Sequence, residues 1–314
     1  MNPFRKIILR LIHKKLDRDF KHAKVITYGR KDKFVIMSDL HRGTADSADN
    51  FYKNRLIYKF AIKNYLKNDY DYIELGDADE LWKNKNQKHI FDQYGDIFWT
   101  IKQFYARGKL HMVYGNHDIV KSNPKWLEKH YSDIFSIDEN SYVPAFKGLK
   151  CYPSVILKPE DESLETFYLT HGHQSELTGD LFWRVSRFFI RHVWRPLESI
   201  GLKEPAGTAE KRLKMQREEN TLIGYARQES KVLIAAHIHR PFIGKYYNNS
   251  GSCISEGYID ALEIEDGKLS LVKWRTEVSE EGVIQIKRKP VKTRTETALA
   301  PNAASLRFFD KKDA

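Results

Sequence analysis

The chain has 314 residues, of which 41% are hydrophobic and 30% are charged, a balance typical of a folded globular protein and not of a disordered one. Its formal net charge of +11 favours polyanionic partners, but nucleic acid, an anionic membrane surface and small phosphorylated molecules all fit that charge. Two cysteines, Cys151 and Cys253, are too few for a disulfide framework, which excludes a small disulfide-stabilised scaffold.

The N-terminal segment, residues 1–24, is predicted to contain an amphipathic helix over residues 4–20. Its apolar face consists of Ile7, Ile8, Leu11, Ile12 and Leu16. Arg10 and His13 interrupt the apolar run, which argues against a signal peptide, and no stretch approaches the roughly 20 apolar residues that span a bilayer. We therefore predict a cytoplasmic protein, with peripheral contact at the inner face of the membrane left open.

Short apolar runs that end in polar residues recur along the next part of the chain. They occupy residues 34–41, 71–77, 110–118, 165–173 and 231–239. Helical patterns at about 50–68, 87–107 and 124–131 separate the first of these runs. Strands that alternate with helices predict an α/β layered fold.

The remaining segments complete the predicted organisation. Residues 174–230 form an insertion with two helices, at about 178–199 and 207–229, and the segment 201–207 is the break between them. Short strands are predicted at 242–249, 257–264, 268–275 and 282–287. One domain, residues 25–288, therefore carries a helical cap insertion, and the polar tail, residues 289–314, is predicted to be mostly disordered.

Each predicted strand delivers metal-ligand types at its end. These side chains are Asp39 and His41, then Asp77, then Asn116 with His117 and Asp118, then His171, and finally His237 and His239. Ligands gather at the carboxyl ends of strands in α/β sheets, and carboxylate, imidazole and amide groups together suit Mn, Fe or Zn. Any one of these motifs occurs by chance, but the five in this order, each at a strand end, predict a site. Gly76 and Gly115 precede the second and third motifs, where the turn off the strand needs backbone freedom.

The ordered set D-x-H, G-D, G-N-H-D, a single His and H-x-H resembles the calcineurin-like metallophosphoesterase superfamily over residues 33–275. The resemblance implies a pair of facing mixed β-sheets flanked by helices, a four-layer sandwich. It also implies two divalent metal ions, with Mn expected and Fe or Zn as alternatives. One ion would be held by Asp39, His41 and His239, the other by Asn116, His171 and His237, with Asp77 between them.

Hydrolytic chemistry follows from such a site. Two metal ions about 3.5–4 Å apart can share a hydroxide that attacks phosphorus in line, so no covalent intermediate is predicted. His117 is predicted to act as a general acid or phosphate-oxygen donor, with Asp118 orienting its imidazole. The superfamily often has Asp where this chain has Glu80, and we expect Glu80, with Asp79 as the alternative, to contact a ligand and not the metal.

Within the superfamily, the segments SDLHRG, ELGDADELW, GNHD, THGH and AHIHRPF are similar to those of the UDP-2,3-diacylglucosamine hydrolase family. This resemblance implies a bacterial pyrophosphatase at the membrane face, with a helical insertion that receives acyl chains. His117 departs from it, because that family commonly has Arg there, which leaves other lipid or nucleotide phosphoesters open. In the insertion, a basic stripe on a largely apolar helix is predicted to bind substrate phosphate, and a core-packing helix is the alternative. The stripe consists of Arg184, Arg187, Arg191 and Arg195.

Two other functions compete with a phosphatase or pyrophosphatase of amphiphilic substrates. A nucleotide or nucleic-acid phosphodiesterase would suit the net charge of +11. A binding scaffold that had lost its chemistry should also have lost ligands or His117, and all of them are present. The sequence therefore favours an enzyme.

Overall fold

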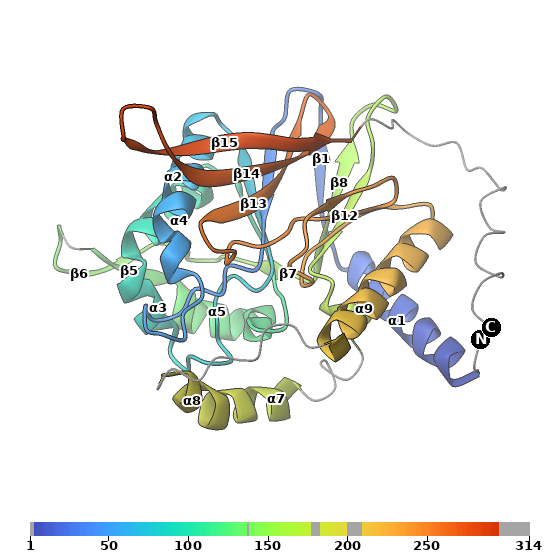
Figure 1. Ribbon diagram of the computed structural model, residues 1–314, viewed down its shortest axis with the longest axis horizontal. Helices are drawn as coiled ribbons and strands as arrows, with labels where there is room; N and C mark the ends of the chain where they lie inside the picture. The colour runs from blue at the N-terminus through green and yellow to red at the C-terminus, as the bar shows by residue number, and fades with distance from the viewer. Residues whose placement is uncertain (1–2, 137, 177–182, 200–208, 295–314) are drawn as a thin grey trace.

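The protein is described by a computed structural model that covers residues 3–136, 138–176, 183–199 and 209–294. Within these residues two mixed β-sheets face each other, and helices cover their outer sides (Figure 1). The predicted fold class, two facing sheets flanked by helices, is confirmed. Among the described residues, no helix combines the length and the apolarity that crossing a bilayer requires.

The seven-stranded sheet holds the first three predicted motifs, and its strand order is β15-β14-β13-β2-β3-β4-β7. Four neighbours run parallel: β2 (Phe34–Met37), β3 (Asp71–Leu75), β4 (Leu110–Val113) and β7 (Cys151–Tyr152). Three run antiparallel: β13 (Tyr258–Glu265), β14 (Lys268–Val278) and β15 (Ile284–Thr293). The strand β15 thus includes residues 289–293, where the tail was predicted to begin. Residues 295–314 of that predicted tail lie outside the described residues.

The six-stranded sheet holds the other two motifs. Its strands, in spatial order, are β1 (Lys24–Tyr28), β8 (Ser154–Pro159), β9 (Phe167–Thr170), β10 (Val232–Ala235), β12 (Tyr247–Asn249) and β11 (Phe242–Ile243). The central strands β9 and β10 are parallel, so their carboxyl ends meet at one edge. A separate antiparallel pair consists of β5 (Asp133–Ser136) and β6 (Ser141–Pro144).

Strand alternation divides the core into layers. In β2, Phe34 and Ile36 join the cluster between the sheets, whereas Val35 and Met37 join the cluster under the helices. The helices on that side are α2 (Arg55–Lys67), α3 (Gln87–Gln93), α4 (Gly95–Ala106) and α5 (Pro124–Tyr131). Three 3₁₀ turns occur at Tyr52–Asn54, Ile119–Ser122 and His173–Ser175.

The six-stranded sheet is covered by α1 (Pro3–Lys21) and α9 (Ala209–Gln228), which confirms both predicted helices (Figure 1). Ile12 and Leu16 of α1 pack with α9 and β10 in one buried cluster. Ile7 and Leu11, predicted on the same apolar face, are 55% and 49% exposed. Ile8 is partly buried and packs against the cluster, so the predicted face is in the core along one side and exposed along the other.

The described part of the insertion that precedes α9 is named the cap segment, Trp183–Ser199. It consists of α7 (Trp183–Phe189), a π-helical turn (Ile190–Trp194) and α8 (Arg195–Ser199). Figure 1 shows this segment apart from the two sheets, beneath the helical layers. The prediction of a helix from residue 178 extends into residues 177–182, which lie outside the described part of the chain.

Candidate metal centre

The predicted site residues follow directly after five strands. Asp39 and His41 follow β2, Asp77 follows β3 and Asn116 follows β4, while His171, His237 and His239 follow β9 and β10. Because β2, β3 and β4 are parallel in one sheet, and β9 and β10 are parallel in the other, each set of strand ends lies at a common edge. The structure brings the aspartate and histidine side chains of this set together where these strand ends meet.

Backbone strain is concentrated at these positions. Five predicted ligands have a positive φ: Asp39 (50°), His41 (50°), Asp77 (50°), His237 (68°) and His239 (56°). A positive φ is uncommon outside glycine and costs about 1–3 kcal/mol per residue. Such strain typically persists where function requires one side-chain placement.

The ligand atoms form overlapping groups. In each group, one atom per residue lies within 4.8 Å of the others, and the groups are Asp39, His41 and His239; His41, Asp77 and His117; and Asp77, His171 and His237. The Nε2 atom of His239 is 3.0 Å from Oδ1 of Asp39, and Nε2 of His171 is 3.1 Å from Oδ2 of Asp77. Asp77 is therefore shared between the groups, as the predicted central carboxylate would be.

Several of these atoms are buried and make no hydrogen bond among the described residues, although two of them, Asp39 Oδ1 and His171 Nε2, lie at ion-pair distances of 3.0 Å and 3.1 Å from another ligand atom. They are Asp39 Oδ1, His41 Nε2, Asn116 Oδ1 and His171 Nε2. In His41 and His171 the opposite ring nitrogen is held, by Glu80 at 3.0 Å and by the carbonyl of Leu75 at 2.9 Å. A ring that donates from Nδ1 presents the lone pair of Nε2, which is the arrangement of a metal-ligating histidine. The residues therefore fit a metal site.

Electrostatics keep two of these groups, Asp39 and His237, in the forms that bind metal. A third, His171, is different, because Asp77 and Asp39 outweigh its burial and raise its pKa to about 9. Burial would raise the pKa of Asp39, but the His239 and His171 imidazoles lower it to about 2. Burial and the neighbouring His171 lower the pKa of His237 to about 3, so that imidazole is neutral at pH 7. Metal binding requires ionised carboxylates and neutral imidazoles, and these two residues meet that requirement.

The structure assigns the orientation of His117 to Glu80 and not to Asp118 as predicted. His117 Nδ1 lies 2.9 Å from Oε1 of Glu80, whose other oxygen contacts His41, and the ring stacks on Trp82 with centroids 4.3 Å apart. Burial lowers the pKa of His117, but Glu80 and Asp77 raise it to about 9. His117 is thus a partly buried imidazole that carries a proton at pH 7.

Asp118 does not orient His117; its carboxylate instead accepts hydrogen bonds from backbone N–H groups. It accepts hydrogen bonds from Gly115 at 2.8 Å, Ala78 at 3.1 Å and Asp77 at 3.3 Å. Asp79, the alternative to Glu80, is fully buried and pairs with Arg42 at 2.8 Å. Neither aspartate contacts the His117 ring.

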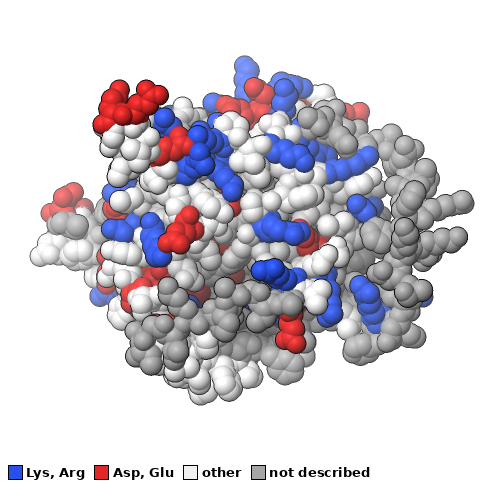
Figure 2. Space-filling view, viewed as in Figure 1, with Lys and Arg blue, Asp and Glu red and all other residues white. Residues whose placement is uncertain are grey.

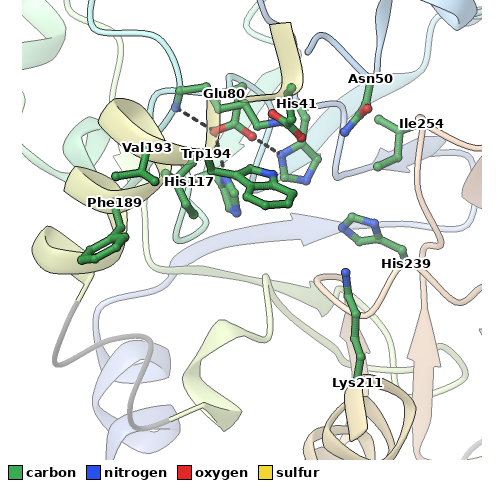
Figure 3. Close-up of a pocket in the computed structure, with 13 residues that line it drawn as sticks. His41, Asn50, Glu80, His117, Phe189, Val193, Trp194, Lys211, His239 and Ile254 are labelled. Carbon is green, nitrogen blue, oxygen red and sulfur yellow. Dashed lines mark hydrogen bonds and ion pairs between the residues drawn. The ribbon is translucent and has the colours of Figure 1, made fainter. Parts of the chain in front are cut away.

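A cavity of about 610 Å³ opens beside these groups. His41, His117 and His239 line one part of it, and the cap segment supplies Phe189 and Trp194 to another (Figure 3). The cavity therefore combines a polar floor with an apolar wall.

The predicted phosphate-binding arginines make other contacts. Arg191 donates to the carbonyls of Leu81 at 2.7 Å and Trp82 at 3.1 Å, and Arg195 donates to the carbonyl of Lys83 at 3.2 Å. These contacts fasten the cap segment to the loop after β3. The π-helical turn at Ile190–Trp194 breaks the α-helical spacing on which the single stripe depended. Arg187 is partly exposed, and the side chain of Arg184 lies outside what the structure describes.

Sequence reasoning missed several residues at the site. Trp82 lies inside the ELGDADELW segment, where an aromatic residue two positions after Glu80 was the only signal. Glu218 of α9 places Oε2 3.9 Å from Nε2 of His237, and Lys121 is fully buried beside Asp118. The positions of Glu218 and Lys121 in the sequence do not predict a role at the site, because only the fold brings these residues close to the motifs.

Comparisons with known proteins give the following similarities. Vps29 from Chaetomium thermophilum is 13% identical, with 84% of this chain and 98% of Vps29 covered and a TM-score of 0.37. Vps29 from the same organism, complexed with the RaPID-derived cyclic peptide RT-D3, is 12% identical, with 84% and 97% covered and a TM-score of 0.37. No curated protein matches the sequence significantly. The two-sheet fold is therefore established by the structure itself.

The sequence model described as Calcineurin-like phosphoesterase matches residues 32–247. This range is more than half of the chain and includes all five motifs, from Asp39 to His239. The chain belongs to the calcineurin-like phosphoesterase family.

Proposed function

We propose that the protein hydrolyses a phosphoester or pyrophosphate bond with the help of two divalent metal ions, of which Mn is the first candidate. Asp39, His41 and His239 would hold one ion; Asn116, His171 and His237 would hold the other, with Asp77 between them. The observation that carries this proposal is the set of buried ligand atoms that converge without hydrogen-bond partners among the described residues. Such atoms are costly unless a cation satisfies them.

When bound, the metal pair supplies an activated water and withdraws charge from the phosphoryl oxygens. The chain's own contribution centres on His117, whose Nδ1 is held by Glu80 while Trp82 supports its ring. The other ring nitrogen can then donate its proton to the leaving oxygen. Because Glu80 also holds Nδ1 of His41, one carboxylate sets the orientation of a ligand and of the proton donor.

The shape of the cavity favours an amphiphilic substrate, such as a nucleotide-sugar lipid similar to UDP-2,3-diacylglucosamine. Phe189, Val193 and Trp194 of the cap segment line the cavity that also contains His117 (Figure 3). An apolar wall within reach of the phosphate chemistry suits an acyl chain. On the face in Figure 2, lysine and arginine side chains are spread among acidic ones and do not form one continuous track, so this face does not favour a nucleic-acid backbone.

The catalytic part of the proposal is tested by removing metal with a chelator, restoring Mn²⁺ and following hydrolysis of bis(4-nitrophenyl) phosphate. Activity should return with Mn²⁺ in the wild type and be lost in Asp77→Asn. His117→Ala should lose more activity on an alkyl phosphodiester than on this substrate, because an alkoxide needs a proton to leave whereas nitrophenolate needs little help. Full activity of Asp77→Asn, or of chelated wild type, would refute metal-dependent catalysis.

The substrate part is tested with two neighbouring phenylalanines. Phe188 and Phe189 are both 61% exposed, but only Phe189 lines the cavity. Phe189→Ser should raise KM for an acylated nucleotide-sugar diphosphate about tenfold or more, because it removes apolar contact, and should leave the small diester unaffected. Phe188→Ser is the matched control. Equal KM values for the two variants on the acylated substrate would contradict the amphiphile proposal.

A further inference from the structure

A row of buried charges lies beside the metal centre, and none of the motifs predicted it as a unit. We name it the charge chain, and it consists of Glu74, Arg42, Asp79, Lys121 and Asp118. Acidic and basic members alternate along it, and each is at most 1% exposed. Charged residues are almost never fully buried unless they are paired, so a run of five requires a reason.

Short contacts join each member to the next. Arg42 places Nη2 3.0 Å from Glu74 Oε1 and Nε 2.8 Å from Asp79 Oδ1. Lys121 Nζ lies 2.8 Å from an oxygen of Asp79 and 2.8 Å from an oxygen of Asp118, as an ion pair with both. Tyr131 supports the middle of the chain, because its hydroxyl donates to Asp79 at 2.8 Å.

The charge chain connects the three loops that carry ligands in the seven-stranded sheet. Arg42 follows His41 in the loop after β2, and Asp79 lies two residues after Asp77 in the loop after β3. Asp118 lies two residues after Asn116 in the loop after β4. Its carboxylate reaches back across the gap between strands, where it accepts the N–H groups of Asp77 and Ala78. A displacement of the charge chain would therefore move candidate metal-ligating residues in all three loops.

Stability alone does not explain this arrangement. Buried ion pairs lose solvation, and apolar side chains of similar volume often replace them without loss of stability. Two cations and three anions also leave one net negative charge, which favours cations bound nearby. Both the connectivity and the charge point to the metal centre.

We propose that Lys121 and Arg42 are positioning residues for the metal centre. They act through Asp118 and Asp79, which hold the loops after β3 and β4 in register so that Asp77 and Asn116 face the same cations. The proposal rests on the proposed function in one respect, because it requires that the site binds metal.

The test compares Mn²⁺ binding to the metal-free wild type and to Lys121→Met, by calorimetry and by electron paramagnetic resonance without substrate. Loss of a residue that orients ligands typically weakens metal binding about 10- to 100-fold. We expect a Kd increase in that range and loss of the exchange-coupled signal of paired Mn²⁺ ions. Lys109→Met removes the same charge from a surface ion pair, and Phe104→Leu disturbs the buried core under α4; both should bind Mn²⁺ as the wild type does.

The variant Asp79→Asn/Lys121→Met covers the case in which Lys121→Met does not fold. It removes one charge of each sign, keeps the net charge of the chain and still cuts the link between the loops, so its Mn²⁺ affinity should also fall. Wild-type affinity and an unchanged coupled signal in either folded variant would overturn the positioning role. If the wild type bound none of Mn²⁺, Fe²⁺ and Zn²⁺, the proposed function would be refuted as well, whereas loss of the positioning role alone leaves wild-type metal binding intact.

Discussion

A single methyl group at Gly115 should disable the metal centre. Gly115 immediately precedes Asn116, and a Cβ there would lie 2.1 Å from Oδ1 of Asp77 and 2.6 Å from its backbone nitrogen. Gly115 is not among the positive-φ glycines, so the close approach and not the backbone conformation demands glycine. Alanine is therefore excluded by the present position of the Asp77 side chain and backbone, and not by φ at residue 115.

The size of the effect follows from these distances. Ordinary carbon contacts begin above 3.0 Å, so the Asp77 carboxylate must move by about 1 Å. The backbone of Asp77 is held in place, because its N–H donates a hydrogen bond to the Asp118 carboxylate. Catalytic groups tolerate about 0.5 Å of displacement, and about 1 Å costs roughly 100-fold in rate, which is about 2.7 kcal/mol. Gly115→Ala should therefore lower kcat/KM about 100-fold.

The assay is Mn²⁺-dependent hydrolysis of bis(4-nitrophenyl) phosphate, with circular dichroism to confirm folding. Gly95→Ala is the matched control, because a Cβ at Gly95 meets nothing within 4 Å, and it should keep wild-type activity. A folded Gly115→Ala variant with wild-type kcat/KM would show that the position of Asp77 does not matter to the chemistry, and the reasoning would fail.

Two further substitutions probe protonation. Glu80→Gln should lower Mn²⁺-dependent activity about 10- to 100-fold, because glutamine offers one acceptor to two imidazoles. Since Glu80 raises the pKa of His117, its removal lowers that pKa and the protonated donor is lost at lower pH, so the alkaline limb of the pH–rate profile should also move to lower pH. In Asp260, burial raises the pKa to about 6, so its stabilising contribution is present in acid and is lost as pH rises through about 6. Asp260→Asn should therefore increase the free energy of unfolding of the metal-free protein at pH 8, by up to about 3 kcal/mol, with little change at pH 4.

Both predictions have clear contrary results. An alkaline limb that stays in place in Glu80→Gln would mean that another group governs it. For Asp260, urea denaturation with chelator present provides the measurement. Equal gains in stability at pH 4 and pH 8 would show that the carboxylate charge is not responsible.

The grouping of the candidate metal ligands was predictable, because these residues lie just after the ends of strands. A short apolar run followed by Asp39 and His41, or by Asn116, locates a strand end without knowledge of the fold, and parallel pairing then gathers such ends at one edge. The same reasoning gave the layered fold, since alternating strands and helices admit few arrangements. The structure adds the pairing of the two sheets and the strands β1 and β8, which occupy segments that carry no site motif.

The structure differs from the predictions where a side chain's partner comes from elsewhere in the fold. Asp118 was assigned to His117 because it is the neighbour in sequence, but its carboxylate turns to the N–H groups of the loop after β3. The arginines were aligned on an ideal α-helix, whereas the cap segment contains a π-helical turn in which Arg191 donates to backbone carbonyls. Lys121 gave no signal, because its burial depends on contacts between loops.

The most direct test of the metal centre is a crystal structure of the protein grown with Mn²⁺, with anomalous scattering recorded at the manganese edge. Two peaks are expected, one near Asp39 and His239 and the other near His171 and His237, with Asp77 in contact with both. A protein that takes up no manganese there, or binds it only away from Asp77, would contradict the assignment of this chain as a two-metal phosphoesterase.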